Sequence, residues 1–193
     1  MKKFLKHIIT CLGVFLFFNV GYAQINSNGT ISLKQISIIG NSNISGFKLS
    51  FNDDRDEIND EVLGIKEADS IVFYIPVEHI TARNRLMLSD FRSLISAREY
   101  PYIKLTINKD QFALLDSNMS NRKLIVKVTL AGTSKVCAIP FYRSCSEVND
   151  AFITGNTDLK LSDFNIDASK KIFGFVRLDD KVFINFKINF SQS

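Results

Sequence analysis

Histidine and cysteine, the residues most often used for nucleophilic or metal chemistry, are scarce in this chain. The sequence contains two histidines, His7 and His79, and three cysteines, Cys11, Cys137 and Cys145. A zinc site or a serine–histidine–aspartate arrangement needs several such groups close together. Once an N-terminal leader is removed, His79 is the only histidine left, so we expect it at the surface or rim. The sequence therefore predicts a protein that is not an enzyme and needs no cofactor.

Charged residues offer two further candidates for chemistry. Residues 52–69 are rich in acids but lack the regular Asp-x-Asp-x-Asp-Gly spacing of a calcium loop, so we interpret them as a solvated loop without metal. No pair of carboxylates has the unusual setting that a carboxylate-dependent hydrolase would need. Arg83, Arg85 and Arg92 could meet an anionic headgroup, although ordinary solvated charges are the favoured interpretation.

The first 23 residues have the pattern of a signal peptide. Basic residues precede an apolar run at 8–20, which is shorter than the about 20 residues of a spanning helix. Small residues, Gly21 and Ala23, follow this run, so we predict cleavage after Ala23. The sequence thus predicts a mature domain over residues 24–193, in the periplasm or secreted, without a transmembrane segment.

Removal of this leader also changes the charge of the protein. It takes three of the 24 basic residues and none of the 20 acidic residues, leaving 21 against 20. Nucleic-acid binding is not expected, because it requires a clustered basic face. In an oxidising compartment Cys137 and Cys145 could form a disulfide; the favoured alternative is a core position for Cys137 and a loop thiol at Cys145.

Apolar and polar residues alternate along most of the mature chain, which is typical of half-buried antiparallel strands. Residues 181–190 are the clearest case, with Val182, Ile184, Phe186 and Ile188 in one row. Strands are predicted over residues 30–40, 47–51, 70–77, 102–107, 123–130, 135–142, 151–161, 171–178 and 181–190.

Turn signals and one amphipathic segment separate these strands. Turns are predicted at 40–43, 131–134, 154–156 and 179–180. A short helix is predicted to begin at an N-cap on Ser89 and to end before Pro101, with Phe91, Leu94 and Ile95 on one face. Many short strands with a single helix favour a closed barrel or a sandwich.

Residues 75–107 carry a family resemblance. A strand ending in Ile-Pro-Val at 75–77 is followed by the short helix and by Tyr-Pro-x-Ile at 100–103, which resembles the signature of the YceI-like family of bacterial periplasmic proteins. The C-terminal half is similar to the same family. The matching residues there are Leu130, Gly132, Thr133, Ile139, Pro140, the segment 159–166, and Phe173, Gly174 and Val176.

The resemblance implies an all-β fold, an eight-stranded antiparallel, extended lipocalin-like β-barrel with one short helix. Its interior would hold a polyisoprenoid, such as an isoprenoid quinone, or another lipid. The region around residues 42–47 is shorter than in better-known members. The chain is thus similar to a diverged, short member of the family.

A chain-like lipid needs little beyond a dry tunnel, because each buried methylene contributes about 0.8 kcal/mol. The predicted cavity-wall residues are Phe47, Leu49, Phe51, Phe73, Ile75, Leu105, Ile107, Val126, Val128, Ile139, Phe141, Leu159, Phe164, Phe186 and Ile188. The alternative is a non-enzymatic structural or protein-binding β-domain with a filled core. A cavity of several hundred cubic ångströms would disfavour that alternative. The sequence leaves the oligomeric state open, a homodimer included.

Overall fold

The computed structural model describes residues 30–52, 62–113, 123–145, 150–168 and 177–191. The predicted signal peptide at 1–23, nearly all of the strand predicted at 171–178 and the centre of the acidic stretch lie outside the described residues. No helix within the described ranges is long and apolar enough to cross a membrane.

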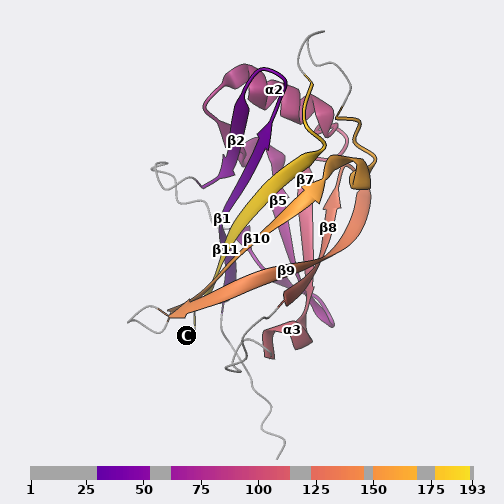
Figure 1. The fold of residues 1–193 in the computed structure, drawn as a ribbon. Helices are drawn as coiled ribbons and strands as arrows, with labels where there is room; N and C mark the ends of the chain where they lie inside the picture. The colour runs from indigo at the N-terminus through magenta and orange to yellow at the C-terminus, as the bar shows by residue number, and fades with distance from the viewer. Residues whose placement is uncertain (1–29, 53–61, 114–122, 146–149, 169–176, 192–193) are drawn as a thin grey trace, which may run out of the picture.

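The described residues form one antiparallel sheet that curls into a barrel-like shape (Figure 1). Its strands are β1 (Thr30–Asn41), β2 (Gly46–Phe51), β3 (Val62–Leu63), β4 (Ile65–Lys66), β5 (Ser70–Pro76), β6 (Thr81–Ala82), β7 (Tyr102–Asn108), β8 (Lys123–Leu130), β9 (Thr133–Cys145), β10 (Asp150–Lys160) and β11 (Lys181–Ser191). The all-β class is confirmed. The strand count differs from the predicted eight, because β3, β4 and β6 are two-residue segments beside eight longer strands.

The sheet order is β4-β5-β7-β8-β9-β10-β11-β1-β2-β6, and β3 pairs with β1. The strands β3 and β4 are separated only by Gly64. The strand β3 pairs with β1 at Ser32↔Leu63, and β4 pairs with β5 at Ile65↔Val72. The Gly64 N–H donates to the carbonyl oxygen of Ile31 at 2.7 Å. Residues 62–66 therefore join the two sides of the curl.

The strands β10 and β11 form the longest ladder, with eleven paired residues from Asp150↔Ser191 to Lys160↔Lys181. The turn predicted at residues 154–156 is wrong, since these residues lie inside β10. Gly155 faces inward there: a β-carbon would lie 2.4 Å from Cζ of Phe186. This glycine makes room for an aromatic ring on the neighbouring strand rather than for a turn.

Two α-helices and two 3-10 helices occur in the described residues, where one short helix was predicted. They are η1 (Val77–His79), α2 (Arg85–Leu94), α3 (Lys109–Ala113) and η3 (Leu161–Phe164). The predicted N-cap was wrong: α2 begins at Arg85 and its N-cap is Asn84, whose side chain accepts a hydrogen bond from Leu86 N at 2.9 Å. Asn and Ser are both good N-cap residues. Because the helix already starts after Asn84, Ser89 lies inside it.

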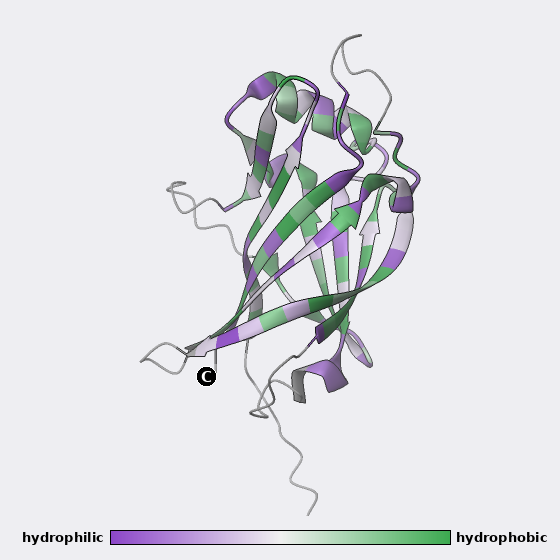
Figure 2. Ribbon diagram, in the orientation of Figure 1, coloured by the Kyte–Doolittle hydropathy of each residue, from purple (hydrophilic) through white to green (hydrophobic). Residues whose placement is uncertain are grey.

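The core lies inside the curl, and α2 covers one end of it (Figure 1). Apolar and polar residues alternate along the strands, as Figure 2 shows. The apolar face predicted for the helix is confirmed, because Ile95 is buried and Phe91 and Leu94 pack against the core.

The disulfide considered for Cys137 and Cys145 is not formed, since Cys137 is a free thiol. Both residues lie on β9, eight positions apart. An extended strand rises about 3.3 Å per residue, so the chain between them spans up to about 26 Å along the strand. A disulfide requires less than about 7 Å.

Candidate binding cavity

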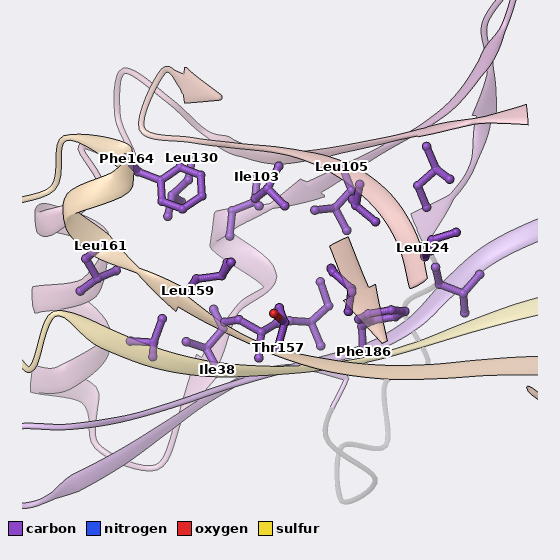
Figure 3. A pocket seen from close by; sticks show the side chains of 18 of the residues that line it. Ile38, Ile103, Leu105, Leu124, Leu130, Thr157, Leu159, Leu161, Phe164 and Phe186 are labelled. Atoms are coloured by element: carbon purple, nitrogen blue, oxygen red, sulfur yellow. The ribbon is translucent and has the colours of Figure 1, made fainter. Parts of the chain in front are cut away.

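An apolar cavity runs inside the curl between the sheet, α2 and η3 (Figure 3). Its volume, counted as space open to the centres of water-sized groups, is about 90 Å³. Its exposed surface is entirely apolar. The lining residues are Ile36, Ile38, Phe91, Ile103, Leu105, Ile107, Leu124, Val126, Val128, Leu130, Ile139, Thr157, Leu159, Leu161, Phe164, Val182, Ile184, Phe186 and Ile188.

Strand register brings most of these side chains together. On β7 and β8, Leu105 pairs with Val128 and Ile107 with Val126. On β10 and β11, Leu159 pairs with Val182. Since residues paired across antiparallel strands point to the same face, each pair adds two apolar groups to the wall.

One end of the cavity is formed by η3 and α2. Leu161 and Phe164 of η3 lie at this end, opposite Leu124 and Phe186 (Figure 3). The helix α2 contributes Phe91 to the lining. The position of η3 therefore determines the shape of this end.

Hydrogen bonds to Asp180 hold η3 against the start of β11. Ser162 N donates to one carboxylate oxygen of Asp180 at 2.7 Å, and the Ser162 hydroxyl donates to the other at 2.7 Å. Leu161 N also donates to the main-chain oxygen of Asp180 at 2.8 Å. The two hydrogen bonds from Ser162 lower the pKa of the Asp180 carboxyl below its ordinary value.

Of the three arginines considered for a headgroup, Arg92 has a structural contact of its own. Arg92 donates to the carbonyl oxygens of Glu78 at 2.8 Å and Ile80 at 3.4 Å, which anchors α2 to η1. Arg83 and Arg85 are exposed at the start of α2. Asp90 is buried, and this desolvation raises the pKa of its carboxyl.

Nine of the fifteen predicted wall residues line the cavity. They are Leu105, Ile107, Val126, Val128, Ile139, Leu159, Phe164, Phe186 and Ile188. Whether any of them contacts a ligand stays a prediction.

The other six predicted residues, Phe47, Leu49, Phe51, Phe73, Ile75 and Phe141, belong to the core or pack against it without lining the cavity. Five of them lie on β2 and β5, where Phe51, Leu49, Phe73 and Ile75 are each at most 1 % exposed. We call β2 and β5 the filled side of the barrel. We call β7, β8, β10, β11 and the Ile36–Ile38 row of β1 the hollow side.

Ten lining residues were missed by the sequence analysis: Ile36, Ile38, Phe91, Ile103, Leu124, Leu130, Thr157, Leu161, Val182 and Ile184. Most continue rows that were already recognised. Val182 and Ile184 belong to the same inward row as Phe186, and Leu124 and Leu130 to that of Val126. The alternation could have included them, whereas Thr157 carries no apolar signal.

A volume of several hundred cubic ångströms would have disfavoured the alternative of a filled core. The observed cavity, at about 90 Å³, is smaller than that. About 10–15 Å³ of such space accommodates one water-sized group, so about 90 Å³ accommodates roughly six to nine of them. A methylene is close to a water molecule in size. The cavity therefore has room for the end of one hydrocarbon chain, and a longer chain requires wall side chains to move.

His79, the histidine considered for acid–base chemistry, does not line this cavity. His79 is exposed, with its Nε2 3.9 Å from a carboxylate oxygen of Glu78. No group of three or more His, Cys, Asp or Glu side chains in the described part of the chain could hold a metal ion. Residues 53–61 of the acidic stretch are outside that part.

Comparison with known proteins gives a family match and several structural matches. The model of the YceI-like domain matches residues 23–190. A polyisoprenoid-binding domain from Saccharophagus degradans implicated in plant cell wall breakdown has a TM-score of 0.63 at 12% identity, covering 86% of this chain and 98% of that chain. At this identity the likeness concerns the fold alone.

Two other solved structures match less well. BcnA from Burkholderia cenocepacia has a TM-score of 0.46 at 14% identity, covering 83% of this chain and 95% of that one. The YceI protein of Campylobacter jejuni has a TM-score of 0.47 at 15% identity, covering 64% and 72%. No curated protein sequence matches the chain.

Proposed function

Since the chain belongs to the YceI-like domain family, we propose that it binds an apolar, chain-like ligand inside the barrel and acts as a binding protein rather than an enzyme. The ligand class is a polyisoprenoid, an isoprenoid quinone or a similar lipid. The solved domain from Saccharophagus degradans is described as polyisoprenoid-binding, and this supports the proposal by analogy.

The entirely apolar surface of the cavity is the observation that carries the proposal. A polar ligand placed there would lose its hydrogen bonds to water without replacement. A hydrocarbon chain loses nothing of this kind. Six to nine buried methylenes at about 0.8 kcal/mol each give about 5–7 kcal/mol before the cost of association.

We further propose an extracytoplasmic location, in the periplasm or outside the cell, after cleavage behind Ala23. The pattern of residues 1–23 supports this location. N-terminal sequencing of the protein recovered from fractions of its own host tests it. A mature chain beginning at Gln24 is expected, and an intact Met1 in a cytoplasmic fraction would contradict the proposal.

Competition binding tests the ligand class. Farnesol and geranylgeraniol are titrated against an apolar fluorescent dye bound to the protein. We expect Val126→Phe, which fills the cavity, to weaken binding of both alcohols by about tenfold or more. The matched variant is Ala138→Phe on β9, where residue 138 is exposed on the opposite face of the sheet. This variant should bind as the original protein does.

The filled side of the barrel favours a second candidate, a structural or partner-binding β-domain with a solid core. Under this alternative the folded protein would bind neither alcohol. Unchanged binding of both alcohols by Val126→Phe, folded by circular dichroism, would instead contradict the cavity as the binding site.

A further inference from the structure

A second hollow lies on the outer face of the sheet, behind the cavity wall. Its volume is about 250 Å³. Tyr142, Thr154, Lys187 and Gln35 form one row across β9, β10, β11 and β1, as the pairs Tyr142↔Thr154, Thr154↔Lys187 and Gln35↔Lys187 show. Strands are about 4.8 Å apart, so this row spans about 14 Å.

A second row lies directly beside the first. Asn156 pairs with Asn185, and Asn185 pairs with Ser37. The two rows are two residues apart along each strand, which corresponds to about 7 Å. The resulting area is large enough for two linked sugar rings lying flat on the sheet.

The neutral polar side chains of this hollow make no hydrogen bonds within the described part of the protein. In the described ranges, none of Gln35, Ser37, Thr154, Asn156 and Asn185 has a side-chain hydrogen bond to another residue. Their donors and acceptors are therefore available to a ligand.

The charge of the hollow is low. Lys187 is the one ionisable group besides the tyrosine phenol among the described residues that line it, and its ammonium lies 4.5 Å from the centre of the Phe152 ring. This cation–π contact directs the ammonium toward Phe152, two residues before Thr154 on β10, and so away from the row of Asn156 and Asn185. The area between the two rows is therefore neutral.

The residue types are unusual for a strand. Asparagine is depleted in strands, yet Asn156 and Asn185 face each other in the centre of the longest ladder. An amide offers both donors and an acceptor, which matches a ligand rich in hydroxyl groups. The eleven residue pairs of β10 and β11 hold these amides on a rigid floor, which reduces the ordering cost of binding.

We propose that this outer hollow binds a neutral oligosaccharide. The amides of Asn156 and Asn185, with Gln35, Thr154 and Ser37, hydrogen-bond the sugar hydroxyls. Tyr142, which is 71% exposed, packs its ring against the apolar face of a sugar ring. The site lies on the opposite face of the sheet from the cavity, so it does not depend on the lipid-binding function.

An NMR titration of the isotope-labelled protein with maltotetraose, cellotetraose and xylotetraose, to tens of millimolar, tests the proposal. At least one of the three should produce saturable shifts of the side-chain amides of Asn156 and Asn185. Tyr142→Ala and Asn185→Ala should each weaken that binding by about tenfold. The matched controls are Tyr102→Ala and Asn108→Ala, at exposed positions of β7; they should bind as the original protein does.

Two results would overturn the proposal. In one, none of the three saccharides gives saturable shifts. In the other, saturable binding persists unchanged in both Tyr142→Ala and Asn185→Ala. Val126→Phe, which fills the inner cavity, should leave saccharide binding unchanged. A failure of lipid binding is thus distinguishable from a failure at the outer hollow.

Discussion

The hollow side and the filled side of the barrel are built from the same kind of strand, but only one of them borders free space. On the hollow side, Leu105, Val128 and Leu159 end at the cavity. On the filled side, Phe51 and Phe73 are at most 1 % exposed and do not line it. The same alternating pattern therefore gives packed core in one place and a cavity wall in another.

Aromatic rings are distributed unequally between the strands of the two sides. The inward row of β2 contains Phe47 and Phe51, and that of β5 contains Phe73, whereas β7 and β8 supply only aliphatic side chains to the cavity. On β11 the cavity is bordered by the ring of Phe186, beside which Gly155 of β10 has no side chain. Residue volume and position within the barrel together decide where free space remains.

The largest expected effect comes from removing an aromatic ring on the filled side. Phe73→Ala should lower the free energy of unfolding by about 3–5 kcal/mol, because the deleted ring leaves a void among well-packed neighbours. Chemical denaturation measures the change. Phe91→Ala, at a half-buried ring that borders the cavity, should cost less than half as much. Equal losses would contradict the distinction between the two sides.

Adding volume should have opposite consequences on the two sides. Ile75→Phe on the filled side should destabilise the protein by about 1–3 kcal/mol through overpacking. Ile184→Phe on the hollow side places the same extra atoms into free space, and its stability should remain within about 1 kcal/mol of the original. Thermal unfolding of the two variants makes the comparison, and a similar loss in both would show that the cavity cannot accept the ring.

The smallest effect concerns the η3 end of the hollow side. Asp180→Ala removes the acceptor of both Ser162 hydrogen bonds and should cost about 1 kcal/mol at neutral pH. Because the folded-state pKa of Asp180 lies below its ordinary value, this stabilisation is present above the ordinary pKa and is lost as the pH falls through the lowered one.

Because the carboxylate is protonated in strong acid, the difference in the free energy of unfolding between the original protein and Asp180→Ala should disappear there. Unfolding curves at several pH values measure this dependence. Asp179→Ala, at the exposed neighbouring position, is the matched control and should change little at any pH. A difference that persisted in strong acid would mean that the carboxylate charge is not responsible.

Alternation alone predicted the strand class and the inward rows. It identified the row of Val182, Ile184, Phe186 and Ile188 on β11, because a period of two fixes the face on which each side chain lies. It could not tell which inward side chains border free space. Phe47 and Phe73 have the same pattern as Leu105, and only the three-dimensional arrangement separates them.

Local turn and cap signals were less informative than alternation. Thr154, Gly155 and Asn156 have turn composition, but Gly155 accommodates the Phe186 ring and Asn156 faces the outer hollow. Ser89 is a good cap residue, yet Asn84 is equally good and comes first along the chain. These errors arise because the same residue types serve packing or binding as well as turns.

Gly64 lies where the two sides of the curl meet, so its size matters for the edges of the sheet. A β-carbon at this position would lie 2.6 Å from Cγ2 of Ile71 and 3.1 Å from the main-chain oxygen of Ile31. We therefore expect a larger residue here to disturb the pairing of β3 with β1. Main-chain groups freed in this way can recruit strands from other molecules, so such a substitution should make the protein more prone to aggregate.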